Sequence, residues 1–106
     1  DMRDAPSIEI IGQLLREDAT VRAYDPVAMD NARREMPDIA YCEDPYAVAV
    51  GSDALVLITE WNEFKQLDMA RIRESMRQAV LLDGRNIYEP EAMRALGFTY
   101  IGIGRG

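Results

Sequence analysis

The sequence predicts a three-layer α/β domain built on a mostly parallel sheet. Short apolar runs alternate with segments in which apolar residues recur at helical spacing, and Gly or Pro separates most of them. The two most apolar runs, residues 54–58 and 79–82, are continuous, which is typical of strands buried on both faces. Strands that alternate with helices form parallel sheets covered on both faces. The 106 residues contain no repeat or linker, so we expect one domain.

The first half of the chain is expected to contain two helices and two strands. A helix over residues 6–17 has a proline in its first turn, and a strand over 20–24 follows it. A second helix spans 27–36, and residues 39–41 form a short strand. The inward face of the first helix is made of Ile8, Ile11, Leu14 and Leu15.

The same alternation continues in the second half. Residues 46–50 form a helix that ends at Gly51, and the apolar runs 54–58 and 79–82 are the next two strands. Asp68 caps a helix between these strands. The inward stripe of that helix consists of Met69, Ile72 and Met76.

The last predicted elements are a helix and a strand. The helix begins at Pro90 and ends at Gly97, and Met93 and Leu96 are expected to point inward. Residues 98–101 form the final strand.

The alternation begins with a helix, and this predicts a gap in the sheet. In the doubly wound strand order 3-2-1-4-5-6, the strand before that helix is the first and central one. We therefore expect a Rossmann-like domain that lacks this strand. An empty slot between residues 20–24 and 54–58 would leave buried backbone groups unpaired, at about 1–3 kcal/mol each. The two strands then pair directly, identical chains exchange a strand to form a homo-oligomer, or a separate segment fills the slot; we favour the first two outcomes.

Composition excludes several classes of function. Twelve basic and 19 acidic residues leave a net charge of −7, which disfavours binding to nucleic acid. No histidine is present, and the one cysteine, Cys42, allows neither an internal disulfide nor a Cys-cluster zinc site, so no metal is expected. No apolar run approaches the roughly 20 residues that cross a bilayer, and no leader is apparent, so we expect a cytoplasmic protein without a membrane partner.

Two candidate sites follow predicted strands at the edge where α/β sheets bind ligands. Asp25 lies where a Rossmann unit places an acidic residue on a ribose hydroxyl, although an Asp before Pro also forms turns. Residues 59–64 carry a Trp and a Phe that could line a pocket or cover the core. Their two carboxylates, Glu60 and Glu63, could act as an acid–base pair or cap the next helix and face water.

A third candidate, Asp83-Gly84-Arg85-Asn86, follows the strand over 79–82. Gly84 permits a tight turn, and Arg85 then projects from the ligand edge, where its guanidinium could bind a phosphate or carboxylate. Arg85 could equally pair with Asp83 or Glu89 at the surface. Cys42 has no neighbour that would activate a thiol, so it is expected to be structural.

Four motifs, in this order and spacing, resemble the C-terminal, UDP-binding domain of the UDP-glucose/GDP-mannose dehydrogenase family, and its bacterial UDP-glucose 6-dehydrogenase branch in particular. The resemblance covers essentially the whole chain, which is read as one UDP-sugar-binding domain, 1–106, truncated at its N-terminal side. The motifs are Asp1-Met2-Arg3-Asp4-Ala5-Pro6, Tyr24-Asp25-Pro26, Thr59-Glu60-Trp61-Asn62-Glu63-Phe64 and Asp83-Gly84-Arg85-Asn86.

The resemblance implies a part in polysaccharide biosynthesis. Family enzymes oxidise UDP-glucose to UDP-glucuronate with two NAD, and their NAD-binding and central domains would be partners of this one. The resemblance places Arg85 on the nucleotide sugar, together with Gly84 and Asp83. The residues that would support the pocket are Tyr24, Asp25, Thr59 and Trp61.

The departures from the family limit what this chain does alone. It has no Gly-x-Gly-x-x-Gly motif, and Cys42 does not match the family nucleophile. We therefore expect no catalytic residue, no cofactor bound by this chain and no activity in isolation. A domain acting on GDP-mannose or UDP-N-acetylmannosamine, or a non-catalytic interaction module, remains an alternative.

Overall fold

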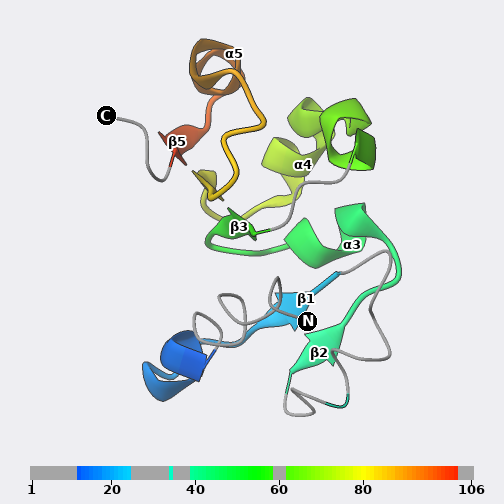
Figure 1. Cartoon of the computed structure of the whole chain (residues 1–106), viewed down its shortest axis with the longest axis vertical. Coiled ribbons are helices and arrows are strands. Elements are labelled where there is room, and N and C mark those ends of the chain that lie inside the picture. Colours follow the sequence, from blue (N-terminus) through cyan, green and yellow to red (C-terminus); the bar gives the residue numbers. More distant parts are fainter. Residues whose placement is uncertain (1–11, 25–33, 35–38, 59–61, 103–106) are drawn as a thin grey trace. The chain divides into compact units, whose positions relative to one another are not determined.

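The computed structural model describes residues 12–24, 34, 39–58 and 62–102, and it confirms the predicted α/β class (Figure 1). The chain divides into two units, Asp1–Val48 and Ala49–Gly106, each with its own sheet. Every strand pairing among the described residues is parallel. In the described ranges no helix is long and apolar enough to cross a membrane.

The first unit holds a two-stranded sheet in which β1 (Arg22–Ala23) pairs with β2 (Ala40–Tyr41). Both strands fall within the residues predicted for them. Residues 12–16 are helical, as expected for the described part of the first helix. The predicted helix over 27–36 lies outside the described residues except for Arg34, which is helical.

The described part of the first helix is less buried than predicted, and Ile8 and Ile11 of its expected inward face lie outside the described residues. Leu14 and Leu15 were expected on its inward face, but they are 37% and 36% exposed. Helical spacing shows that a face is apolar, but burial depends on which element covers that face, and the helix's own sequence does not specify it.

The second unit holds the three-stranded sheet β3-β4-β5. β3 (Leu55–Leu57) pairs with β4 (Val80–Asp83), and β4 pairs with β5 (Thr99–Gly102). The register sets Leu57 opposite Asp83, so the two strands end at the same edge of the sheet.

Helices connect these strands as the alternation requires. α4 (Met69–Ser75) joins β3 to β4 after the 3-10 helix η2 (Asn62–Gln66), and α5 (Pro90–Ala95) joins β4 to β5. The Asp68 carboxylate accepts the Arg71 N–H at 3.1 Å, which confirms the predicted cap. α3 (Pro45–Ala49) lies at the boundary of the two units, one residue earlier than predicted.

The core of the second unit lies between its helices and one face of the sheet. Leu81, Asp83 and Tyr100 are buried on that face, while Ile101 on the edge strand β5 is 47% exposed. In the described part of this unit, the other buried hydrophobic residues are Ala49, Phe64, Met69, Ile72, Met76, Tyr88, Met93 and Phe98.

Burial on both faces was predicted for the strands at 54–58 and 79–82, and this prediction is wrong. All of β3 is half-buried and β4 alternates between buried and half-buried residues. Leu96, expected inward, is 37% exposed. A continuous apolar run cannot distinguish a strand covered on both faces from one at the edge of a sheet.

Within each sheet, the described strands have the neighbours that the predicted order requires. β2 and β1 correspond to strands 3 and 2 of the 3-2-1-4-5-6 order, and β3, β4 and β5 correspond to strands 4, 5 and 6. Direct pairing of the strands at 20–24 and 54–58 stays a prediction, because β1 and β3 belong to separate units. The two strands belong to sheets of separate units, and each pairs with a neighbour in its own unit.

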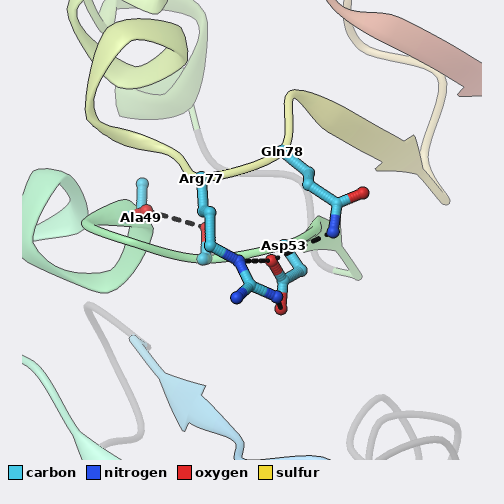
Figure 2. Close-up of polar contacts among 5 residues, drawn as sticks. Ala49, Asp53, Arg77 and Gln78 are labelled. Carbon is cyan, nitrogen blue, oxygen red and sulfur yellow. Dashed lines mark hydrogen bonds and ion pairs between the residues drawn. The ribbon is translucent and has the colours of Figure 1, made fainter.

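Polar contacts that were not predicted from the sequence join the segments just before β3 and β4 (Figure 2). The Ser52 carbonyl accepts the backbone N–H groups of Arg77 and Gln78 at 2.8 and 3.1 Å. The Arg77 guanidinium binds Asp53 with two hydrogen bonds, one of them 2.8 Å long. The two side chains are 69% and 53% exposed, so the backbone bonds, rather than this ion pair, align the strands.

The turns at Gly51 and Gly97 provide a test of the fold. Their φ angles are 69° and 102°, and a Cβ at Gly97 would lie 2.7 Å from Arg73 Nε, whereas none at Gly51 would meet an atom within 4 Å. Gly97→Ala should therefore lower the free energy of unfolding by about 1 kcal/mol or more, and by more than Gly51→Ala does. Urea unfolding of both variants measures this, and equal losses would contradict the greater backbone strain expected at a φ of 102°.

Candidate functional site

The segment after β4, residues 84–88, forms a tight turn that we call the 84–88 turn. The Gly84 N–H donates to the Leu57 carbonyl at 2.8 Å, which attaches the start of the turn to the end of β3. Asn86 has a φ of 56°, a left-handed conformation that asparagine tolerates better than most residues. The turn therefore lies at the carboxyl edge of the sheet, where open α/β sheets bind their ligands.

The turn is built around the carboxylate of Asp83, which is 0% exposed. Asp83 Oδ1 accepts the Arg85 N–H at 3.1 Å, and Oδ2 accepts the Tyr88 N–H at 3.0 Å. The Tyr100 hydroxyl, from β5, also donates to Oδ2 at 2.8 Å. One buried side chain thus links β4 and β5 to both ends of the turn.

Hydrogen bonds keep the buried Asp83 carboxyl in its ionised form. Burial on its own raises the pKa of Asp83, because it penalises the charged form. Hydrogen bonds from the Tyr88 N–H, the Tyr100 hydroxyl and the N–H groups of Ile87 and Arg85 lower it. These bonds outweigh burial, so the pKa lies below its ordinary value of 3.8 and Asp83 is ionised at neutral pH.

Two tyrosines extend the network to neighbouring elements. The Tyr88 hydroxyl donates to the Phe64 carbonyl of η2 at 2.6 Å, inside the core. The Tyr100 hydroxyl also lies 3.3 Å from the Tyr88 carbonyl, and the Arg94 guanidinium is 5.9 Å from the centre of the Tyr100 ring. The 84–88 turn is therefore anchored to β3, β5 and η2.

The structure describes only part of the predicted site. Asp83, Gly84 and Arg85 are together at the sheet edge, where Asp83 is buried and the Arg85 side chain is exposed. Tyr24, half-buried, follows β1 in the first unit. Asp25, Glu60, Thr59 and Trp61 lie outside the described residues, and Glu63 is exposed on η2.

Sequence reasoning missed the two residues that hold the turn. Tyr88 and Tyr100 were assigned no role, yet both contact Asp83. The available indication was the aspartate at the end of a strongly apolar strand, because a buried carboxylate requires donors nearby.

The arrangement suits recognition of an anion more than acid–base catalysis. Asp83 is a buried anion that is already hydrogen-bonded, and Arg85 presents an exposed cation at the sheet edge. Cys42 is a half-buried free thiol in the first unit. Across the described ranges, no group of three or more His, Cys, Asp or Glu residues could hold a metal ion.

The lowered pKa of Asp83 predicts a loss of stability in acid. A carboxyl whose pKa is lower when folded stabilises the protein above its unfolded value, about 3.8, and this contribution is lost as the pH falls through the folded pKa. Tyr100→Phe removes one donor and should raise the folded pKa of Asp83. The fall in the free energy of unfolding between pH 7 and pH 3 should then be smaller in the variant than in the wild type.

Urea unfolding at each pH measures this difference. The exposed Asp53, whose pKa is also lowered, chiefly by its hydrogen bond from Arg77, is present in both proteins, so its contribution cancels in the comparison. An identical fall in both proteins would show that Tyr100 does not stabilise the Asp83 carboxylate.

Comparison with known proteins identifies relatives at both the sequence and structure levels. UDP-glucose 6-dehydrogenases from Pseudomonas aeruginosa and Rhizobium meliloti are 48% and 45% identical to the chain over 111 and 105 residues. Each alignment covers 99% of this chain, which spans about a quarter (24%) of the length of these relatives.

The fold is shared with solved nucleotide-sugar dehydrogenases. The crystal structure of NDP-N-acetyl-D-galactosaminuronic acid dehydrogenase from Methanosarcina mazei Go1 matches 99% of this chain and 22% of its own, with a TM-score of 0.79 and 28% identity. A UDP-D-ManNAc dehydrogenase from Pyrococcus horikoshii, at 22% identity and a TM-score of 0.58, matches 92% of this chain and 29% of its own and shows the fold alone. The Rossmann-like α/β fold is thereby confirmed.

The family profile settles the assignment that the motifs suggested. The profile of the UDP binding domain of the UDP-glucose/GDP-mannose dehydrogenase family matches residues 1–90, most of the chain. The resemblance read from the four motifs is confirmed, and the chain belongs to the UDP-glucose/GDP-mannose dehydrogenase family, of which it carries the UDP binding domain.

Proposed function

We propose that the chain is the UDP-sugar-binding domain of an NAD-dependent UDP-glucose 6-dehydrogenase acting in the cytoplasm. The observation that carries the proposal is the exposed Arg85 on a turn anchored at the carboxyl edge of the sheet. The identities of 48% and 45% to UDP-glucose 6-dehydrogenases support UDP-glucose as the substrate. The ligand of the domain would be UDP-glucose or its product, UDP-glucuronate.

The overall reaction converts the C6 alcohol of the sugar to a carboxylate. Two NAD each accept one hydride, one water supplies the second oxygen, and three protons are released. This chain contains no Gly-x-Gly-x-x-Gly motif to cradle a dinucleotide, so we assign NAD and the reacting groups to the enzyme's other domains. Those NAD-binding and central domains are the proposed partners of this one.

The contribution of this chain to that reaction is to bind the nucleotide. A UDP-sugar carries two negatively charged phosphates whatever its sugar, and a guanidinium binds phosphate through two parallel hydrogen bonds. Arg85 is the proposed contact to the diphosphate, and Gly84 allows the ligand to approach the backbone. Tyr24, Asp25, Thr59 and Trp61 are proposed to support the pocket.

A related nucleotide-sugar substrate is the second candidate. The relative from Methanosarcina mazei, an NDP-N-acetyl-D-galactosaminuronic acid dehydrogenase, shares the fold at 28% identity. Titration of the intact protein with UDP-glucose, UDP-N-acetylmannosamine and GDP-mannose separates the candidates. Tightest binding of UDP-glucose supports the proposal, and preference for either other nucleotide sugar contradicts it.

Arg85→Ala tests the nucleotide contact. Loss of a charge-assisted bidentate contact costs about 1.5–3 kcal/mol, so the KM for UDP-glucose in the intact enzyme should rise roughly tenfold or more. Arg77→Ala is the matched control, because Arg77 is an exposed arginine at the amino end of the same strands. Steady-state kinetics should show an unchanged KM for Arg77→Ala. An unchanged KM for Arg85→Ala would refute the assignment.

The chain alone is predicted to be inactive. Purified residues 1–106 with UDP-glucose and NAD should give no NADH absorbance above a blank without enzyme, because no cofactor or catalytic group is assigned to them. An intact UDP-glucose 6-dehydrogenase in the same assay is the positive control. Sustained NAD reduction by the 106 residues would contradict the domain assignment.

A further inference from the structure

The Asp83 carboxylate cannot serve as a ligand contact while the turn keeps its observed form. It is 0% exposed, and both of its oxygens accept hydrogen bonds from the protein. Turning it toward a ligand would break those bonds and leave their donors buried without a partner, which is unfavourable. The carboxylate therefore forms hydrogen bonds within the protein rather than with a ligand.

The donors that face Asp83 determine the path of the turn. The backbone N–H groups of Arg85 and Tyr88 donate to the two oxygens of this carboxylate, so it fixes both ends of the turn. The Arg85 N–H is among them, at 3.1 Å. The backbone of the exposed arginine is consequently held by the buried anion two residues earlier.

Tyr100 completes this cluster from a different element. Its hydroxyl lies 2.8 Å from Asp83 Oδ2 and 3.3 Å from the Tyr88 carbonyl, so one buried group contacts both the carboxylate and the end of the turn. The Tyr100 side chain is 4% exposed, and β5 pairs with β4 at Leu81 opposite Tyr100. Tyr100 also lies outside residues 1–90, the part that matches the family profile.

From this geometry we infer that Asp83 and Tyr100 are positioning residues for Arg85, and that they set UDP affinity without touching the nucleotide. The inference rests on the proposed function, in which Arg85 binds the diphosphate. Asp83 holds the Arg85 backbone, and Tyr100 holds Asp83. When the backbone is already fixed, its guanidinium loses less conformational entropy on binding than a guanidinium on a mobile loop does. The affinity for the diphosphate is therefore higher.

A double-mutant cycle between Tyr100 and Arg85 tests the inference. The dissociation constant for UDP is measured by calorimetry in the intact protein for the wild type, Tyr100→Phe, Arg85→Ala and the double variant. Tyr100→Phe removes one hydroxyl and should weaken UDP binding about three- to tenfold when Arg85 is present. In the Arg85→Ala background it should change the dissociation constant by less than about twofold, because the residue through which it acts is gone.

Two further variants separate positioning from a general loss of stability. Ser75→Ala removes a hydroxyl that donates to the Ile72 carbonyl at 2.8 Å in α4, away from the turn, and should leave UDP affinity unchanged. Asp83→Asn should weaken UDP binding more than Tyr100→Phe does, since it removes the charge that all the donors share. If Asp83→Asn fails to fold, the double-mutant cycle between Tyr100 and Arg85 alone tests the positioning role.

Each result of the cycle has a defined meaning. Weaker binding for Arg85→Ala with no effect of Tyr100→Phe would overturn the positioning role and leave the proposed function intact. Equal losses from Tyr100→Phe in both backgrounds would also overturn it, because the effect would not pass through Arg85. No UDP binding by the wild type, or none lost in Arg85→Ala, would overturn the proposed nucleotide contact and this inference with it.

Discussion

A buried negative charge at the end of β4 is the constraint around which the carboxyl edge of the sheet is organised. Asp83 has no exposed surface, and an ion in such a place is stable only when donors surround it. The chain supplies these donors from the next turn of backbone and from a tyrosine on β5. The path of the 84–88 turn and its attachment to β5 follow from this requirement, which also holds the backbone of Arg85. At the opposite edge, the exposed Asp53–Arg77 pair imposes no comparable constraint.

The alternation of apolar runs was enough to predict the class of fold and the neighbours of the strands within each sheet. Parallel strands, the Asp68 cap and the ends at Gly51 and Gly97 all depend on local sequence, and the structure confirms them in the second unit. Burial was harder to predict, because it depends on what covers a face. Leu96 and the strand over 54–58 are as apolar as core residues, yet they are exposed or half-buried.

The position of the site was predicted from the sequence, but the hydrogen bonds within it were not. The sequence alone indicated that Asp83, Gly84 and Arg85 follow a strand at the ligand edge, and the structure places them there. It could not indicate that Asp83 turns inward, because its partner Tyr100 is 17 residues away and meets it only through the pairing of β4 with β5. The roles of nearby residues in a motif therefore differ: Arg85 is exposed at the carboxyl edge of the sheet, and the aspartate two residues before it supports the turn.

The most direct test is a crystal structure of the intact protein with UDP bound. The prediction is an Arg85 guanidinium within hydrogen-bonding distance of the diphosphate, with Asp83 still buried and accepting a hydrogen bond from the Tyr100 hydroxyl. A diphosphate bound away from the 84–88 turn, or an Asp83 carboxylate turned outward onto the nucleotide, would contradict it.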